Sequence, residues 1–340
     1  MKQIFEKCKK DIDNRLNEVL DQEIAKYRNN EFIRNALLEL KRLSQNGKRV
    51  RGFLVKVGQL LKGVDDNSYL DLAVAMEIFQ TAVLIHDDII DNADMRRGME
   101  TITHKHPNHL GVSKAICIGD LGFFLAYRII NETYFSDEIK TSILKIFTDT
   151  IYNTVIGEIT DVELPYQSKE YHKMMSDDVI YDIYVNKTAW YTIIGPLLMG
   201  AITNNISDAD KSNLIEIGIN LGSAFQIKDD LLGLYSNKDG IGKTLNDVKE
   251  GKQTIIYKYA INNASKEELK YINEYYGNSL VDEKESIKII TLFTKLGAKD
   301  NAEKLLKDHT YKSIKLVEQS SFENKEILIS FSNYLLNREN

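Results

Sequence analysis

The chain has 340 residues, enough for one large domain or two small ones with a hydrophobic core. Its 44 Lys and Arg residues against 50 Asp and Glu residues give a formal net charge of −6, and no long basic run is present, so we exclude a nucleic-acid partner. Only two cysteines occur, Cys8 and Cys117, which excludes a disulfide framework or a sulfur-ligated metal site and favours a cytoplasmic protein.

The composition predicts an all-α fold. The chain has only three prolines and long stretches without a helix breaker. Residues 1–13 alternate charged and apolar side chains without a continuous hydrophobic run, so we expect no signal peptide. Neither a flexible linker nor a fixed-period repeat interrupts the chain. We therefore expect a single all-α domain over residues 1–340.

The first helical pattern that carries chemistry ends in an acidic triplet. An apolar stripe over residues 72–83 leads directly into Asp87, Asp88 and Asp91. Spacings of three and four residues place the three carboxylates toward one face of a helix. A solvated acidic helix end would explain them, but carboxylates that follow an apolar run are partly buried and need a cation or a proton. The pattern favours a divalent metal site.

The longest apolar stretch, residues 188–203, is interrupted by Gly195 and Pro196. It falls short of the roughly 20 residues that span a bilayer. We expect two buried helices that meet at this break, and no transmembrane segment.

A second apolar stripe, over residues 214–225, ends at Asp229 and Asp230, with Gln226 one turn earlier on the same face. Two acidic pairs in matching settings predict a hard cation site with oxygen ligands only. Because Mg²⁺ typically uses one or two carboxylates together with phosphate oxygens and waters, the predicted ligand is a polyphosphate.

The rest of the chain indicates turns and further helices. Polar clusters at 204–212 and 262–268 predict turns, the second with the capping-box spacing of Ser265 and Glu268. Residues 242–244 resemble the end of a P-loop, but Asn237 stands where that motif needs glycine, so we exclude a nucleotide P-loop. Residues 285–340 are amphipathic and predict further outer helices, to which we assign no chemistry.

Basic residues accompany both acidic segments. Arginine binds phosphate through two parallel hydrogen bonds, and lysine acts as a point charge. Each basic residue alone is explained as a surface charge, and only their joint occurrence with the aspartates favours phosphate binding. The residues are Lys48, Arg51, Arg96, Arg97, Lys187, Lys243 and Lys252.

These motifs, in order from GKRVRG at Gly47 to EGKQT at Thr254, resemble the trans-type polyprenyl diphosphate synthases, which include farnesyl and geranylgeranyl diphosphate synthases. The resemblance implies an all-α bundle around a deep central cavity, usually a homodimer, in which three Mg²⁺ ions bridge an allylic diphosphate to both aspartate motifs. Metal-site residues by position are Asp87, Asp88, Asp91, Asp229 and Asp230. The isopentenyl diphosphate site would comprise Lys48, Arg51, Gln80 and Arg97, and the allylic diphosphate site Arg96, Lys187, Thr188, Gln226, Lys243 and Lys252.

The implied reaction is head-to-tail condensation of an allylic diphosphate with isopentenyl diphosphate. Magnesium and lysine charges stabilise the departing diphosphate, an allylic carbocation forms, and the isopentenyl double bond attacks it before a proton is lost. We expect no side-chain nucleophile. Thr188 and Gln226 either assist through oriented dipoles or make a structural hydrogen bond. The residues expected to carry the reaction are Asp87, Asp91, Lys187, Thr188, Asp229 and Lys243.

Two positions depart from the family pattern. Gly233 stands where a third aspartate is most often found, which either weakens metal binding or is tolerated, and we favour tolerance. Glu158 replaces the usual glutamine three residues before Asp161, and its effect is left open.

Product length in this family depends on side-chain size along the helix before the first aspartates. Ala82, five residues before Asp87, is small enough to let a tail pass, which disfavours a farnesyl-length stop. Phe79, one turn further down, either forms the floor or is ordinary core packing, and Val83 lies between these positions and the aspartates. We expect a linear all-trans product of about twenty carbons or somewhat longer.

Three alternatives stay open. A class I terpene cyclase would share the fold, but we expect it to carry a different second metal motif and to lack an isopentenyl site. A non-catalytic subunit of a heteromeric synthase would keep the fold while losing metal ligands, and Gly233 is its only sign. A purely structural helical protein would explain the apolar stripes but not the charged residues.

Overall fold

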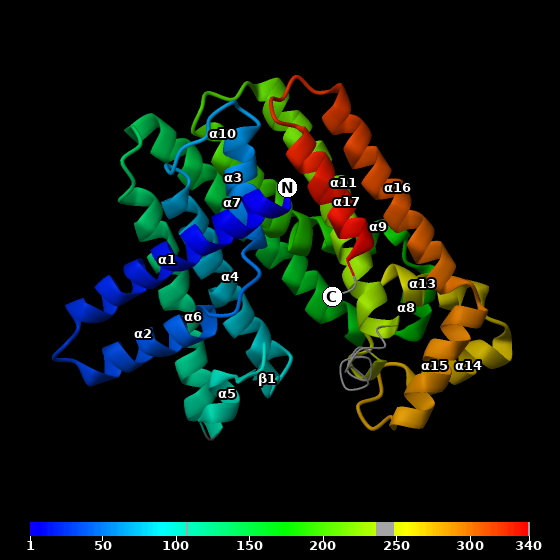
Figure 1. The fold of residues 1–340 in the computed structure, drawn as a ribbon. Helices are drawn as coiled ribbons and strands as arrows, with labels where there is room; N and C mark the ends of the chain where they lie inside the picture. The colour runs from blue at the N-terminus through cyan, green and yellow to red at the C-terminus, as the bar shows by residue number, and fades with distance from the viewer. Residues whose placement is uncertain (107, 236–247, 339–340) are drawn as a thin grey trace. The chain divides into compact units, whose positions relative to one another are not determined.

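The computed structural model describes residues 1–106, 108–235 and 248–338, and the chain forms two compact units. The first unit comprises residues 1–148 and 195–207, and the second comprises residues 149–194 and 208–340. The described residues are helical apart from one short hairpin and the connecting segments, as Figure 1 shows. The predicted all-α class is confirmed.

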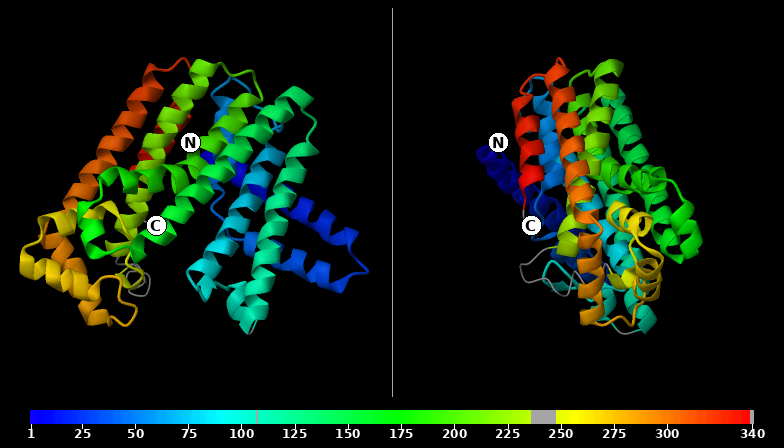
Figure 2. Two further views of the ribbon diagram at one scale, coloured as in Figure 1. Left: turned by 180° about the vertical axis from the view of Figure 1, so that it is seen from behind. Right: turned by 90° about the vertical axis from the view of Figure 1, so that its right-hand side faces the viewer.

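The first unit is built around the helix that carries the first aspartates. Helix α4 (Leu70–Ile90) packs against α6 (Asn108–Asn131), and α3 (Val50–Leu60) packs against α10 (Gly195–Ile202). Helices α1 (Lys2–Lys26) and α2 (Glu31–Ser44) pack against each other and against α4 (Figures 1 and 2). The unit also contains α5 (Ile102–Lys105) and the first part of α7 (Asp137–Glu163).

The helices α3 and α10 approach closely because glycine stands at the contact. A Cβ added at Gly58 of α3 would lie only 2.1 Å from the backbone oxygen of Leu197 in α10. The apolar core of this unit includes the fully buried rings of Phe53, Phe79 and Phe147.

A hairpin interrupts the helices directly after the first aspartates. Strands β1 (Met95–Arg96) and β2 (Met99–Glu100) pair antiparallel. The two residues between them, Arg97 and Gly98, have φ angles of 52° and 76°. Positive φ at both positions is the geometry of the two-residue hairpin turn that matches strand twist. The all-α expectation missed this hairpin because strands of two residues leave no alternating pattern.

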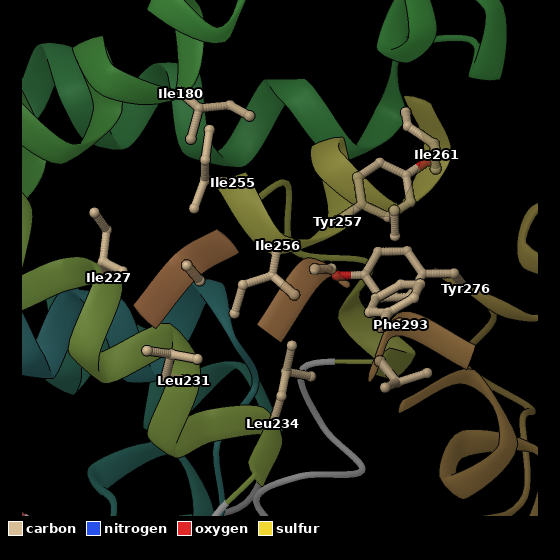
Figure 3. Close-up of a cluster of buried hydrophobic side chains, with 14 of the residues drawn as sticks. Ile180, Ile227, Leu231, Leu234, Ile255, Ile256, Tyr257, Ile261, Tyr276 and Phe293 are labelled. Carbon is tan, nitrogen blue, oxygen red and sulfur yellow. The ribbon is translucent and has the colours of Figure 1, made fainter. Parts of the chain in front are cut away.

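The second unit has its own apolar core. Side chains of α11 (Asp208–Tyr235) and α13 (Ile255–Asn263) meet those of α15 (Glu283–Lys295), as Figure 3 shows. Within it, the rings of Tyr257 and Tyr276 stack with centroids 4.5 Å apart. The remaining elements are η1 (Leu164–Tyr166), α8 (Lys169–Met174), α9 (Asp177–Ile183), η2 (Tyr184–Ile194), α14 (Lys266–Tyr275), α16 (Ala298–Gln319) and α17 (Glu326–Asn337).

Several local predictions are confirmed. Helices α4 and α11 carry the two apolar stripes, and Ser265 and Glu268 form a capping box at the start of α14. The predicted break at Gly195 lies where η2 ends and α10 begins. Segment η2 has π-helical hydrogen bonding, which is rare and is frequently found at functional sites.

Among the described residues, α6 is the one helix long and apolar enough to cross a membrane by length and composition. A core helix of a soluble protein passes the same test, and α6 packs against α4. It is therefore not a clear membrane span.

Candidate active site

The first aspartate motif lies at the C-terminal end of α4, and an arginine from the hairpin is bound to it. Arg96 donates from Nε to Asp88 Oδ1 at 2.6 Å and from Nη2 to Asp87 Oδ2 at 3.0 Å. Burial raises the pKa of Asp88, and the Arg96 charge offsets this only in part. Burial alone would lower the pKa of Arg96, but Asp88 and Asp87 outweigh it and raise that pKa. Asp91 occupies the C-cap position of α4. The hairpin thus fixes a cation on two of the three predicted carboxylates.

A group of arginines lies at the GKRVRG segment of the same unit. Burial lowers the pKa of Arg97, and the nearby positive charge of Arg51 lowers it further. Arg49 is 2% exposed and donates to Asp13 at 2.6 Å and to the Ser44 carbonyl at 2.8 Å, which indicates a structural function. Burial thus acts on Arg97 together with the charges of Arg51 and Arg49, against the opposing charge of Glu77, and a buried group of arginines is suited to an anion.

Two further predicted binding residues belong to this unit. Lys48 is exposed, two residues before the start of α3, and Gln80 is half-buried on α4. Gln80 lies two turns before Asp87 and therefore on the same helix face.

In the second unit, the second aspartate motif belongs to a polar network between η2 and α11. Thr188 donates its hydroxyl to Gln226 Oε1 at 2.6 Å, and Gln226 Nε2 donates to Asp230 Oδ1 at 2.8 Å. The Tyr184 hydroxyl donates to Asp230 Oδ2 and accepts from the backbone N–H of Ile255 at 3.1 Å. Burial and the Asp230 charge raise the pKa of Tyr184 well above its ordinary value. Both Asp230 oxygens thus have protein partners.

Lys187, next to Thr188 in the chain, faces a different helix. Its Nζ lies 2.9 Å from Glu158 Oε2 and 2.6 Å from Asp161 Oδ2, both on α7. The backbones meet here because Gly157 has no side chain: a Cβ would lie 2.1 Å from the Lys187 backbone nitrogen. The carboxylate at position 158, whose effect the sequence left open, is therefore a direct partner of the predicted diphosphate lysine.

Asp229, the predicted main ligand of the second motif, has an arginine partner that sequence reasoning missed. Arg338, which follows α17, binds Asp229 Oδ1 through Nη2, and its guanidinium lies 4.2 Å from the ring centroid of Phe225. Arg338 belongs to the stretch to which we assigned no chemistry. No local pattern identifies it, because 109 residues separate the two partners.

The remaining predicted residues of the second unit lie around α13. Lys252 is half-buried, three residues before the start of α13 at Ile255, and its Nζ lies 3.4 Å from Glu250 Oε2. Gly233 is buried in α11, one turn after Asp229. Lys243 lies outside the described residues.

The predicted chain-length residues occupy three different environments on α4. Val83 is half-buried, one turn before Asp87. Ala82 is fully buried against α6, where a Cβ on Gly122 would come within 2.9 Å of the Ala82 Cβ. Phe79 is 1% exposed and belongs to an aromatic cluster, with ring centroids 5.7 Å from Phe123 and 5.3 Å from Phe147.

The described residues fit a magnesium–diphosphate complex better than a bare metal ion. Within the described ranges, no three His, Cys, Asp or Glu side chains gather closely enough to hold a metal by themselves. Mg²⁺ requires fewer protein ligands, since it keeps several waters and shares phosphate oxygens with its substrate. The donors at both motifs are oxygens only, which suits this hard cation.

Comparison with known proteins agrees with this fold. The polyprenyl synthetase family model matches residues 35–293. The chain is 30% identical over 285 residues to a short chain isoprenyl diphosphate synthase of Methanocaldococcus jannaschii, covering 82% of this chain and 83% of that protein. It is 32% identical over 233 residues to a geranylgeranyl diphosphate synthase of Saccharolobus solfataricus, covering 68% of each.

A solved geranylgeranyl pyrophosphate synthase from Corynebacterium glutamicum, complexed with isoprenyl diphosphate and magnesium, superposes with a TM-score of 0.85. It is 25% identical and aligns over 96% of this chain and 97% of that one. The fold is therefore the all-α isoprenoid synthase fold. The chain belongs to the polyprenyl synthetase family, and it is a prenyltransferase of the kind that elongates prenyl diphosphates.

Proposed function

We propose that this chain condenses an allylic diphosphate (dimethylallyl, geranyl or farnesyl) with isopentenyl diphosphate to make a linear all-trans polyprenyl diphosphate. The observation that carries the proposal is a cation on each aspartate motif. Arg96 binds Asp87 and Asp88, and Arg338 binds Asp229. Carboxylates that already attract a guanidinium are suited to the metal ions that accompany a diphosphate.

Three Mg²⁺ ions are proposed for the working enzyme, with Asp87, Asp91 and Asp229 as ligands. When bound, the metal supplies charge that stabilises the departing diphosphate. Asp88 and Asp230 are proposed to support these ligands, since their oxygens are held by Arg96, by Gln226 and by Tyr184.

The chain's own residues are proposed to bind and orient the two substrates. Lys187 and Arg96 stabilise the leaving group of the allylic substrate, and Lys243 and Lys252 contribute further positive charge. Thr188 directs its oxygen dipole at the developing carbocation, and its hydrogen bond to Gln226 fixes that dipole.

The isopentenyl diphosphate is proposed to bind at the arginine group of the first unit, through Arg51, Arg97, Lys48 and Gln80. Burial and the neighbouring charge of Arg51 lower the pKa of Arg97 against the opposing charge of Glu77, and a bound diphosphate would stabilise the charged form of this arginine.

A product of about twenty carbons or somewhat longer is proposed. Val83 is half-buried one turn before Asp87 on the same helix face, and Phe79 with its aromatic neighbours would close the path below it. Ala82 contributes by allowing α6 to approach α4.

A cytoplasmic homodimer whose full length acts as one catalytic domain is proposed from the family resemblance. The alternative of a non-catalytic subunit predicts no turnover by the purified chain alone. A class I terpene cyclase would release a hydrocarbon or an alcohol, whereas a synthase retains the diphosphate on its product.

The decisive experiment incubates the purified chain with Mg²⁺, isopentenyl diphosphate and one allylic primer at a time, and identifies products by mass. Linear diphosphates extended by five-carbon units should form, and Asp87→Ala should abolish them. Asp94→Ala is the matched control, because the Asp94 side chain is 74% exposed and its partner is His104. Absence of product from every primer would refute the proposal and favour the non-catalytic subunit.

A further inference from the structure

The carboxylate of Asp229 is the acidic group of the second motif that remains accessible. Asp230, its neighbour, is buried between Gln226 and Tyr184, whereas the Asp229 side chain is 44% exposed. Arg338 binds this accessible carboxylate and comes from the C-terminal part of the second unit's sequence.

Arg338 is held in place by more than the ion pair. Its side chain is only 9% exposed, and its guanidinium lies over the Phe225 ring, one helical turn before Asp229. Stacking over an aromatic face and pairing with a carboxylate are both typical of arginine and are not reproduced by lysine. A surface arginine that met Asp229 by chance would not be buried in this way.

The guanidinium nevertheless has unused binding capacity. Its Nε is buried and has no hydrogen-bond partner in the described structure. An arginine has five N–H donors in a planar fork that matches carboxylate and phosphate oxygens equally well. Arg338 can therefore exchange the Asp229 carboxylate for a diphosphate oxygen and keep the same hydrogen-bond geometry.

We propose that Arg338 is a diphosphate-positioning residue that binds Asp229 in the free protein and exchanges to the diphosphate when a metal–diphosphate complex takes over that carboxylate. A guanidinium and a metal ion compete for the same Asp229 carboxylate, so the ion pair lowers the apparent affinity for metal. If the pair is populated in about nine molecules of ten, the apparent metal affinity falls about tenfold. This inference rests on the proposed function only in taking Asp229 as a metal ligand.

The test is a titration of the full chain with Mn²⁺ in the absence of substrate, followed by the paramagnetic resonance of free Mn²⁺. Arg338→Gln should bind Mn²⁺ about five- to tenfold more tightly than the parent chain, and this gain should vanish in an Asp229→Asn background. Lys325→Gln is the matched control, since it removes one positive charge near the start of α17, where Lys325 bonds the Glu318 carbonyl. It should leave Mn²⁺ binding unchanged.

A second titration, with inorganic diphosphate at saturating Mn²⁺, tests the exchange. Arg338→Gln should weaken diphosphate binding about fivefold or more. Arg338→Lys keeps the charge but not the planar fork, so its diphosphate affinity should lie between those of the parent chain and Arg338→Gln. Unchanged Mn²⁺ affinity in Arg338→Gln would overturn the competition, and unchanged diphosphate affinity would overturn the exchange. Both titrations are independent of turnover, so a parent chain that makes no prenyl product refutes the proposed function and leaves this test intact.

Discussion

Replacing Gly157 by alanine should lower the activity about 100-fold by moving Lys187. The added Cβ would lie 2.1 Å from the Lys187 backbone nitrogen, whereas real Cβ atoms keep at least 3.0 Å. The obstacle is backbone, so no side-chain rotation relieves it, and α7 and η2 must separate by about 1 Å at this point. Overpacking of this kind costs about 1–3 kcal/mol of stability. A displacement of about 1 Å at a reacting group costs about 10²-fold in rate.

The matched control is Gly58→Ala, which creates a backbone clash of the same 2.1 Å between α3 and α10 in the first unit. Both variants should lower the melting temperature by a similar amount. Steady-state kinetics at a temperature where both are folded should then show the roughly 100-fold loss of kcat/KM for the allylic substrate only in Gly157→Ala. Equal kinetic losses in the two variants would show that the close contact at Gly157 serves stability alone, and the reasoning would be wrong.

Three further outcomes follow from the structure. Tyr184→Phe removes a hydrogen bond to the Asp230 carboxylate and should cost about 2 kcal/mol, or roughly 3 °C in a thermal melt; an unchanged melt would contradict this. Burial lowers the pKa of His172 below its ordinary 6.5, so the unfolded chain binds this proton more readily. Unfolding free energy should therefore fall as pH drops below about 6.5, and urea titrations of His172→Gln should show a smaller fall. Val83→Phe should shorten the product, as measured by mass spectrometry. Ala82→Phe should instead lower the free energy of unfolding by about 1–3 kcal/mol, because Ala82 is fully buried against α6. Equal shortening of the product by both variants would refute this distinction.

Much of the fold was predictable because its signals are local. The stripe before Asp87 and the stripe before Asp229 have the helical period, and each lies on a long helix in the structure. The capping box at Ser265 and the break at Gly195 depend on neighbouring residues only, and both are confirmed.

The partners within the site were not predictable, because they are distant in the sequence. Spacing places Asp229 and Asp230 side by side, but it does not reveal that Tyr184 binds one of them and Arg338 the other. The ion pair of Glu158 with Lys187 likewise could not be predicted, because it depends on the close approach of α7 to η2 in the folded chain.

The π-helical segment η2 has a consequence for how the sequence can change. Two neighbouring residues of this segment point to different helices: Lys187 to α7 and Thr188 to α11. Each residue added to or removed from a regular helix turns everything beyond it by about 100°. A one-residue deletion within η2 would therefore turn the residues on one side of the deletion relative to those on the other and change which helices of the second unit they face. The length of residues 184–194, and not only their side chains, is therefore needed to keep Lys187 at α7 and Thr188 at α11.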